Sequence, residues 1–339
     1  MKTKLVYVLT SNESDYYLEQ ALLSAFSVRT HNPNAVILLV TDNDTKATLV
    51  GNRSLIQNYV TEVIGVDVPS EYSMMQRSRY IKTSLRNIID GDFLYIDTDT
   101  IICDDLSDID LFDCSIGATT DGNGPLYVAD FYEGKKHFIR LQSEQCNVPY
   151  AFDDAPFFNG GIIYAKDDSI SRQLYSLWHS NWKKNIALGV NRDQFPLLCA
   201  NKELGWVIKE IPPEYNCQVT EEGLRYLYKA KIIHYYAMVQ TNYLLGQRPI
   251  LERIKNEGIA DDIKDIAINR AKGAFGSDAR IVIPQKGPIE STYYYQLYTS
   301  SKIGCKVVNG FSKFVFHLVV FGAKMRNYYK RSLLHHSLK

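Results

Sequence analysis

Short apolar runs alternate with amphipathic segments over the first two thirds of the chain. Runs typical of buried strands occupy residues 5–9, 35–40, 60–66, 93–96, 115–119, 162–165, 206–211 and 230–236. Apolar residues recur every three or four positions, as in helices, over about 15–26, 45–57, 76–89, 130–142, 168–184 and 193–203. Strands that alternate with helices predict an α/β fold with flanking helices around a Rossmann-like, mostly parallel central sheet.

The length and composition suit a large globular α/β domain with an appendage. The chain has 339 residues, of which 45% are hydrophobic and 22% charged. We expect one main domain at residues 1–245, a helical or mixed extension at 246–300, and a separate basic, aromatic, helical tail at 301–339.

Charge is distributed unevenly along the chain. Lys+Arg and Asp+Glu both number 38, yet no acidic residue follows Glu290. Eight Lys and Arg residues beyond that point give the tail a charge of +8, so the remainder carries −8. Aromatic residues such as Phe311 and Phe314 are interleaved with these cations, which is typical of an interfacial helix on an anionic membrane surface. The alternative is a C-terminal helix that packs on the domain with a basic outer face. For the protein as a whole, no nucleic-acid partner is expected.

The cysteines and the N-terminus indicate a cytoplasmic protein. Six cysteines are scattered without a C-x-x-C pair or a histidine at metal-ligand spacing, as expected of reduced thiols. The apolar run at 5–9 is too short for a signal sequence, and no stretch reaches the ~20 apolar residues of a membrane span.

The most informative segment is 93–99, in which four apolar residues lead directly into Asp97, Thr98 and Asp99. A run of this kind predicts a buried parallel strand, and ligands of open α/β sheets bind at the carboxyl ends of such strands. Two carboxylates at that edge can hold a hard divalent cation, which can in turn hold a diphosphate. Alone, however, a D-x-D triplet is a weak signal.

Two families of enzymes place this triplet after a strand. In haloacid-dehalogenase-like phosphatases the first Asp is a nucleophile and the second a general acid, and 97–101 nearly fits their motif. In nucleotide-sugar transferases the triplet binds a metal that bridges the donor diphosphate. The position favours the transferase, because about 90 residues of strand–helix units precede Asp97 here, whereas the phosphatase motif normally follows the first strand.

Six features in sequence order resemble those of the family 8 glycosyltransferases, which have the GT-A fold. They are the first strand and loop ending in Thr10-Ser11, Arg79, the segment 93–99, 158–163 (Phe-Asn-Gly-Gly-Ile-Ile), Asp193-Gln194, and 232–235 (Ile-Ile-His-Tyr). The resemblance covers about 1–240. Taken singly, these features have simpler explanations: a turn at 159–161, a structural histidine at 234, a helix N-cap at 193 and a surface arginine at 79.

The resemblance implies a role for each residue. Asp97, Asp99 and His234 would bind Mn²⁺ or Mg²⁺, and the metal would hold the diphosphate of the donor. Gln194 would lie under the anomeric carbon, where a neutral amide favours front-face attack with retention, and Asp193 would hold hydroxyls of the sugar. The donor-binding residues would be Thr10, Ser11, Arg79, Thr98, Asn159, Gly160 and Gly161.

The implied activity is the retaining, metal-dependent transfer of galactose or glucose from a UDP-hexose to a glycan or lipid-linked acceptor. The enzyme would be a peripheral protein at the inner face of the cytoplasmic membrane. Two departures stand out: Ser11 occupies a position where the family often has Asp, and no Lys-Pro-Trp follows His234. The alternatives are therefore a phosphatase that uses Asp97 and Asp99, and an inactive, membrane-associated nucleotide-sugar-binding module.

Overall fold

The computed structural model describes residues 1–235 and 244–268 together with individual helical positions between 303 and 325. The chain divides into two compact units, Met1–Asp278 and Ala279–Lys339. The first unit contains all the strands described below.

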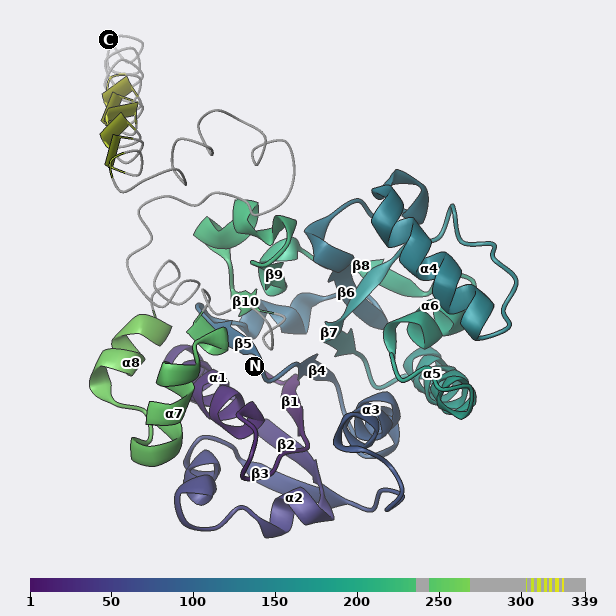
Figure 1. Cartoon of the computed structure of the whole chain (residues 1–339), viewed down its shortest axis with the longest axis horizontal. Coiled ribbons are helices and arrows are strands. Elements are labelled where there is room, and N and C mark those ends of the chain that lie inside the picture. Colours follow the sequence, from purple (N-terminus) through teal and green to yellow (C-terminus); the bar gives the residue numbers. More distant parts are fainter. Residues whose placement is uncertain are drawn as a thin grey trace, which may run out of the picture. The chain divides into compact units, whose positions relative to one another are not determined.

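A seven-stranded sheet in the order β3-β2-β1-β4-β7-β6-β8 forms the centre of the first unit (Figure 1). Its strands are β1 (Lys4–Leu9), β2 (Ile37–Asp42), β3 (Glu62–Val66), β4 (Phe93–Ile96), β6 (Ile116–Thr120), β7 (Phe158–Ala165) and β8 (Ile208–Glu210). Only β7 runs antiparallel to its neighbours, and the other four pairings are parallel. The prediction of an α/β fold with a mostly parallel central sheet is therefore confirmed.

Helices cover both faces of this sheet. They are α1 (Tyr17–His31), α2 (Asn43–Ala47), α3 (Met74–Ser84), α4 (Glu133–Gln145), α5 (Ser169–Ala187) and α6 (Gln194–Glu203). Alternate residues of β1 face opposite sides, so Leu5 joins the cluster that includes α1, whereas Val6 joins the cluster that includes α3, α5 and α6. Both clusters are buried, which fixes the register of the sheet and hence the positions of its strand ends.

A small second sheet closes over the end of β4. It consists of β5 (Thr100–Ile102), β10 (Ile232–His234) and β9 (Cys217–Gln218), in that order. His234 pairs with Thr100 across β5 and β10. This pairing places the end of β10 beside the loop that follows β4, although β4 and β10 are more than a hundred residues apart in sequence.

Some element boundaries differ from the prediction. Strand β7 begins at Phe158 rather than 162, because the two glycines, for which a turn was the simpler explanation, lie within a fully buried strand. The helix predicted at 45–57 is split into α2 and a 3₁₀ segment, Gly51–Asn58, since Val50 is extended and Gly51 has a φ of +55°.

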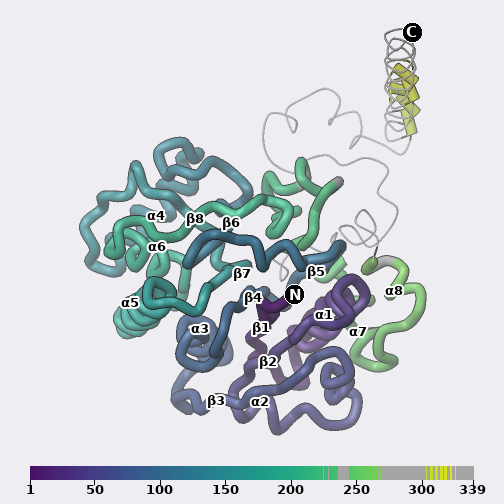
Figure 2. The backbone as a smooth tube through the Cα atoms, turned by 180° about the vertical axis from the view of Figure 1, so that it is seen from behind, coloured from purple at the N-terminus to yellow at the C-terminus, as the bar shows by residue number. Residues whose placement is uncertain are grey.

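Two further helices, α7 (Arg248–Glu257) and α8 (Asp261–Ala267), follow β10. Leu251 of α7 and Ile263 of α8 are buried in the same cluster as Leu22 of α1, and both figures show these helices beside α1 (Figure 2). The described start of the predicted 246–300 extension thus packs on the main domain. Residues 269–300 lie outside the described part, and the domain boundary at 245 stays a prediction.

In the second unit, the described positions between 303 and 325 are helical. Apolar side chains among them are exposed, as for Phe311, Phe314 and Phe321, at 58%, 61% and 63%. Within the described residues, no helix combines the length and the apolarity that crossing a bilayer requires.

Candidate functional site

A cleft of about 640 Å³ opens at the carboxyl ends of β1 and β4, within the usual size range of small-molecule sites. Its lining includes eleven of the twelve residues that the sequence predicts for the site. These are Thr10, Arg79, Asp97, Thr98, Asp99, Asn159, Gly160, Gly161, Asp193, Gln194 and His234. The fold therefore gathers residues from six separate stretches of sequence into one cavity.

Asp97, Asp99 and His234 converge at one point of the cleft. One ligand atom from each lies within 4.8 Å of the others. His234 Nε2 lies 3.8 Å from Asp97 Oδ2 and 3.5 Å from Asp99 Oδ1. Burial lowers the pKa of His234, but the two carboxylates raise it, and their effect is the larger. Two carboxylates and one imidazole form a donor set that fits Mn²⁺ and also accepts Mg²⁺.

The close approach of these ligands depends on Gly161. A Cβ at this position would lie 2.3 Å from His234 Cε1 and 2.7 Å from Asp97 Oδ2, so no other residue fits without moving a ligand. The neighbouring Gly160 is different, because its Cβ would be at ordinary distances of 3.6 Å from Lys82 Nζ and 3.8 Å from Asp193 Oδ2. Gly161 thus has a steric role that sequence reasoning did not separate from that of Gly160.

A chain of hydrogen bonds supports His234 from behind. Asn216 Nδ2 donates to Asn159 Oδ1 at 3.0 Å, so the carbonyl oxygen of Asn216 is the atom that faces His234 Nδ1, 2.9 Å away. Nδ1 must then carry the proton, which leaves Nε2 as the nitrogen that faces the two carboxylates. Histidines that bind metals are commonly oriented by such a carbonyl partner. Nothing in the sequence pattern around Asn216 indicates this role.

Asp193 is held between two cations. Its carboxylate lies 3.1 Å from Arg79 Nε and 3.0 Å from Lys82 Nζ. Burial would raise the pKa of Asp193, but Lys82 and Arg79 lower it to about 2. Although Asp193 precedes α6, its side chain makes no capping hydrogen bond, so it is not the ordinary N-cap that the isolated residue suggested.

Sequence reasoning missed Lys82. This buried lysine lies one helical turn after Arg79 on α3, and its Nζ is also 3.6 Å from Asp97 Oδ1. It therefore connects the two acidic groups of the site. Lys82 follows Arg79 by three residues, a spacing that places both cations on one face of a helix. This spacing is the feature of the sequence that could have identified Lys82.

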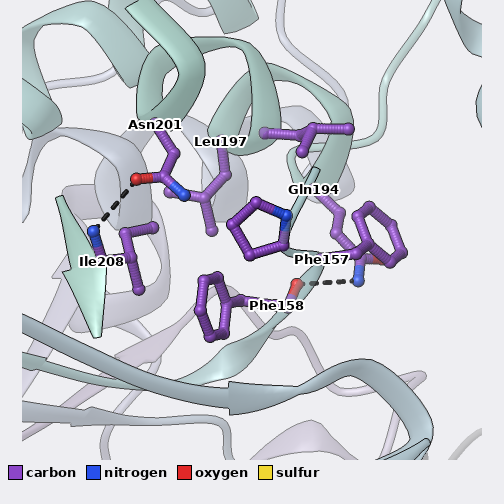
Figure 3. Close-up of a pocket in the computed structure, with 8 residues that line it drawn as sticks. Phe157, Phe158, Gln194, Leu197, Asn201 and Ile208 are labelled. Atoms are coloured by element: carbon purple, nitrogen blue, oxygen red, sulfur yellow. Dashed lines mark hydrogen bonds between the residues drawn. The ribbon is translucent and has the colours of Figure 1, made fainter. Parts of the chain in front are cut away.

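The amide of Gln194 is fixed by two acceptors. Its Nε2 donates to Asp121 Oδ1 at 2.7 Å and to the backbone oxygen of Phe158 at 3.0 Å, the second of which is drawn in Figure 3. Sequence reasoning did not single out Asp121, which directly follows β6.

The two residues predicted from the first loop, Thr10 and Ser11, differ in whether they line the cleft. Thr10 lines the cleft, and its hydroxyl donates to the backbone oxygen of Met74 at 3.0 Å. Ser11 is buried behind it, with its hydroxyl donating to Asp15 at 2.8 Å and accepting from Arg53 at 3.2 Å. Its side chain is therefore turned toward the protein.

The segment after His234, where the family motif is absent, continues into residues 236–243, which lie outside the described part of the chain. Arg79 and Arg248 are the two candidates to replace the missing lysine, and Arg79 lies in the cleft. Arg248 instead pairs with Glu252 on α7, and its side chain is 75% exposed.

No family model matches the chain, and no curated protein matches it. Its structure is similar to several solved glycosyltransferases. The galactosyltransferase LgtC, solved with donor and acceptor sugar analogs, has 16% identity and a TM-score of 0.49, with 78% of this chain and 99% of that chain covered. Mouse xyloside xylosyltransferase 1 in its apo form has 15% identity and a TM-score of 0.46, covering 69% and 97%. GlyE of Streptococcus pneumoniae TIGR4 has 16% identity and a TM-score of 0.43, covering 71% and 55%.

These proteins are glycosyltransferases by name, the class that the order of motifs in this sequence resembles. Identities of 15–16% and TM-scores below 0.5 mark a distant likeness. The residues gathered in the cleft, rather than that likeness, carry the functional argument.

Proposed function

We propose that this protein is a metal-dependent, retaining glycosyltransferase that moves a hexose, galactose or glucose, from a UDP-sugar to a glycan or lipid-linked acceptor. The observation that carries the proposal is the convergence of Asp97, Asp99 and His234 in the same cleft as the Asp193–Gln194 pair. A metal-ligand set beside a pair of polar side chains matches what transfer from a nucleotide-sugar requires.

The residues fit the implied cation. Asp97, Asp99 and His234 would hold Mn²⁺ or Mg²⁺, since their ligand atoms converge and Gly161 leaves the room that this convergence needs. When bound, the cation would neutralise the charge that develops on the departing diphosphate. Thr98 and Thr10 also line the same cavity.

The charges around Asp193 favour its proposed role as a binding residue. Arg79 and Lys82 neutralise its carboxylate, which makes it a weaker nucleophile than a free carboxylate would be. It can still accept hydrogen bonds from sugar hydroxyls. Gln194 is a neutral amide and a poor nucleophile, so both side chains favour front-face attack with retention over a covalent intermediate.

We also propose that the tail binds an anionic membrane surface, which would place the enzyme at the cytoplasmic face of the membrane. The support is the helical state and exposure of the described apolar positions between 303 and 325, together with eight cations and no acid after Glu290. Co-sedimentation with anionic vesicles at low salt, compared with a chain ending at residue 300, tests this. Full-length protein that stays in the supernatant would contradict it.

The transfer itself is tested by incubating the full-length protein with UDP-galactose or UDP-glucose and Mn²⁺, and by following UDP release with and without candidate acceptors. We expect metal-dependent release and, with an acceptor, an α-linked product identified by NMR. A β-linked product would contradict retention. Release of phosphate from a monoester without UDP-sugar turnover would instead favour the phosphatase alternative.

A further inference from the structure

Asp121 lies behind the cleft, at the end of β6, and is 2% exposed. Its Oδ1 accepts from Gln194 Nε2 at 2.7 Å and from Asn159 Nδ2 at 3.1 Å, while Oδ2 contacts Lys135 Nζ of α4. Burial alone would raise the pKa of Asp121, but Lys135 and these donors lower it. The carboxylate therefore stays ionised at neutral pH, and an ionised carboxylate can only accept hydrogen bonds.

The surroundings of Gln194 permit only one direction of its amide. Both partners of its nitrogen, the Asp121 carboxylate and the backbone carbonyl of Phe158, are acceptors without a hydrogen to donate. A flipped amide would place its carbonyl oxygen against two other oxygens. The carbonyl oxygen of Gln194 is consequently the polar atom that remains for a molecule in the cleft.

The direction of the Asn159 side-chain amide follows independently from its own hydrogen-bond partners. Its Nδ2 faces Asp121, and its Oδ1 accepts from the backbone N–H of Gly161 at 2.9 Å, which is a group that can only donate. An acceptor on one side and a donor on the other thus agree on the direction of this amide. Asp121 consequently contacts two of the amide side chains that line the cleft, those of Asn159 and Gln194.

We propose that Asp121, with Lys135 as its counter-ion, is the positioning residue that turns the carbonyl oxygen of Gln194 toward the reacting sugar. The role rests on the proposed transfer function. Positive charge grows at the anomeric carbon as the diphosphate leaves, and a fixed carbonyl dipole directed at that carbon stabilises it. An amide N–H₂ in the same place would oppose that charge, so the direction of the amide affects the transition state more than the binding of the donor.

The test uses two double variants of the full-length chain. Asp121→Leu with Lys135→Met removes the acceptor and its counter-ion together, because an apolar pair of similar volume avoids a buried unpaired charge. Asp121→Asn with Lys135→Met keeps an oxygen that can accept from Gln194. We expect the first variant to lower kcat by about 10–100-fold with the Kd for the UDP-sugar within about threefold, and the second to stay within about fivefold in kcat.

Equal values of kcat in the two double variants would overturn the proposal, as would a loss of donor affinity in proportion to kcat, which would make Asp121 a donor-binding residue. Lys136→Met is the matched control for removal of a neighbouring cation on α4, since Lys136 pairs with Glu133 rather than with Asp121. It is expected to leave both constants unchanged.

A second readout does not depend on turnover. In protein labelled with ¹⁵N-glutamine, the Gln194 amide is assigned by its absence from the Gln194→Ala spectrum. Slow exchange of both Nε2 hydrogens in the wild type, lost in the Asp121→Leu/Lys135→Met variant, supports the orientation. Fast exchange in the wild type overturns it. Protected hydrogens in a wild type that transfers no sugar would support the orientation while contradicting the proposed function.

Discussion

The two walls of the cleft differ in how their polar side chains are held. On the first wall, formed by the loop after β1, Thr10 donates to a backbone oxygen and Ser11 is engaged by Asp15 and Arg53. On the second wall, formed by β7, the end of β10 and the start of α6, each functional atom is directed by a polar side chain behind it. Asn216 directs His234, and Asp121 directs Gln194.

This difference indicates where substitutions should matter. The first wall contributes its shape and a few hydroxyl groups to the cleft, so donor binding should tolerate the loss of one hydroxyl. The second wall depends on the direction of amide and imidazole groups, so residues that never touch a ligand should affect metal binding or turnover. The following predictions test this difference, starting with the largest expected effect.

The largest effect is expected from Gly161→Ala on the second wall. The added Cβ would lie 2.3 Å from His234 Cε1 and 2.7 Å from Asp97 Oδ2, so at least one proposed metal ligand must move. We expect transfer to fall by at least about 100-fold, since a shift of about 1 Å at a reacting centre costs that much. Mn²⁺-dependent UDP binding, measured by calorimetry, should be lost.

Gly160→Ala is the matched control for this change. Its Cβ would meet Lys82 and Asp193 only at ordinary contact distances. Mn²⁺-dependent UDP binding should therefore persist. If both alanine variants lose it, the steric argument for the metal ligands is wrong.

A smaller effect is expected from Asn216→Leu, which removes the carbonyl that faces His234 Nδ1. The imidazole would lose its orientation, and we expect the affinity for Mn²⁺ to fall by about 10–100-fold. Competition with a fluorescent metal indicator measures this in the absence of any donor. An unchanged Mn²⁺ affinity in a folded variant would show that Asn216 does not orient the ligand.

The helices α3 and α5, which lie outside both walls, should respond to pH. His179 of α5 bonds to Thr83 of α3, the helix that carries Arg79 and Lys82, and burial lowers the pKa of His179 to about 4. Between pH 6.5 and 4 the unfolded chain binds more protons at this histidine than the folded one does, so the folded state loses stability as pH falls.

His179 is only partly buried, so solvent screening reduces this contribution to about 1–2 kcal/mol at full effect. Urea unfolding at pH 7 and pH 4.5 should show a smaller pH dependence for His179→Gln than for the wild type. An identical dependence in both would contradict the assignment.

The smallest effect is expected from Ser11→Ala on the first wall. Its hydroxyl is turned toward Asp15 and Arg53, so removal should cost about 1 kcal/mol of unfolding free energy and change Mn²⁺-dependent UDP affinity by less than about threefold. A loss of UDP affinity as large as that from Gly161→Ala would erase the distinction between the walls.

The sequence predicted most strands because their apolar runs are buried on both faces. It placed β7 too short, since Gly160 and Gly161 read as a turn when the neighbouring strands and the crowding by His234 are unknown. It also missed β5 and β9, which have only three and two residues and carry too little pattern to detect.

At the site, residues with a distinctive local pattern were predicted, such as Asp97 and Asp99 after β4 and His234 after β10. The supporting residues Asp121, Asn216 and Lys82 were not. Their roles arise from contacts between residues 15 to 111 positions apart in the chain, which only the fold defines. Arg79 was predicted, but its pairing with Asp193 was not.

The most direct test of the account is calorimetric titration of UDP into the full-length protein with and without Mn²⁺, for the wild type, Asp99→Ala and Asp90→Ala. Asp90 is an exposed carboxylate in the loop before β4 and serves as the matched control. We predict Mn²⁺-dependent UDP binding in the wild type and in Asp90→Ala, and its loss in a folded Asp99→Ala. Equal Mn²⁺-dependent affinity in all three proteins would contradict the metal centre at Asp97, Asp99 and His234.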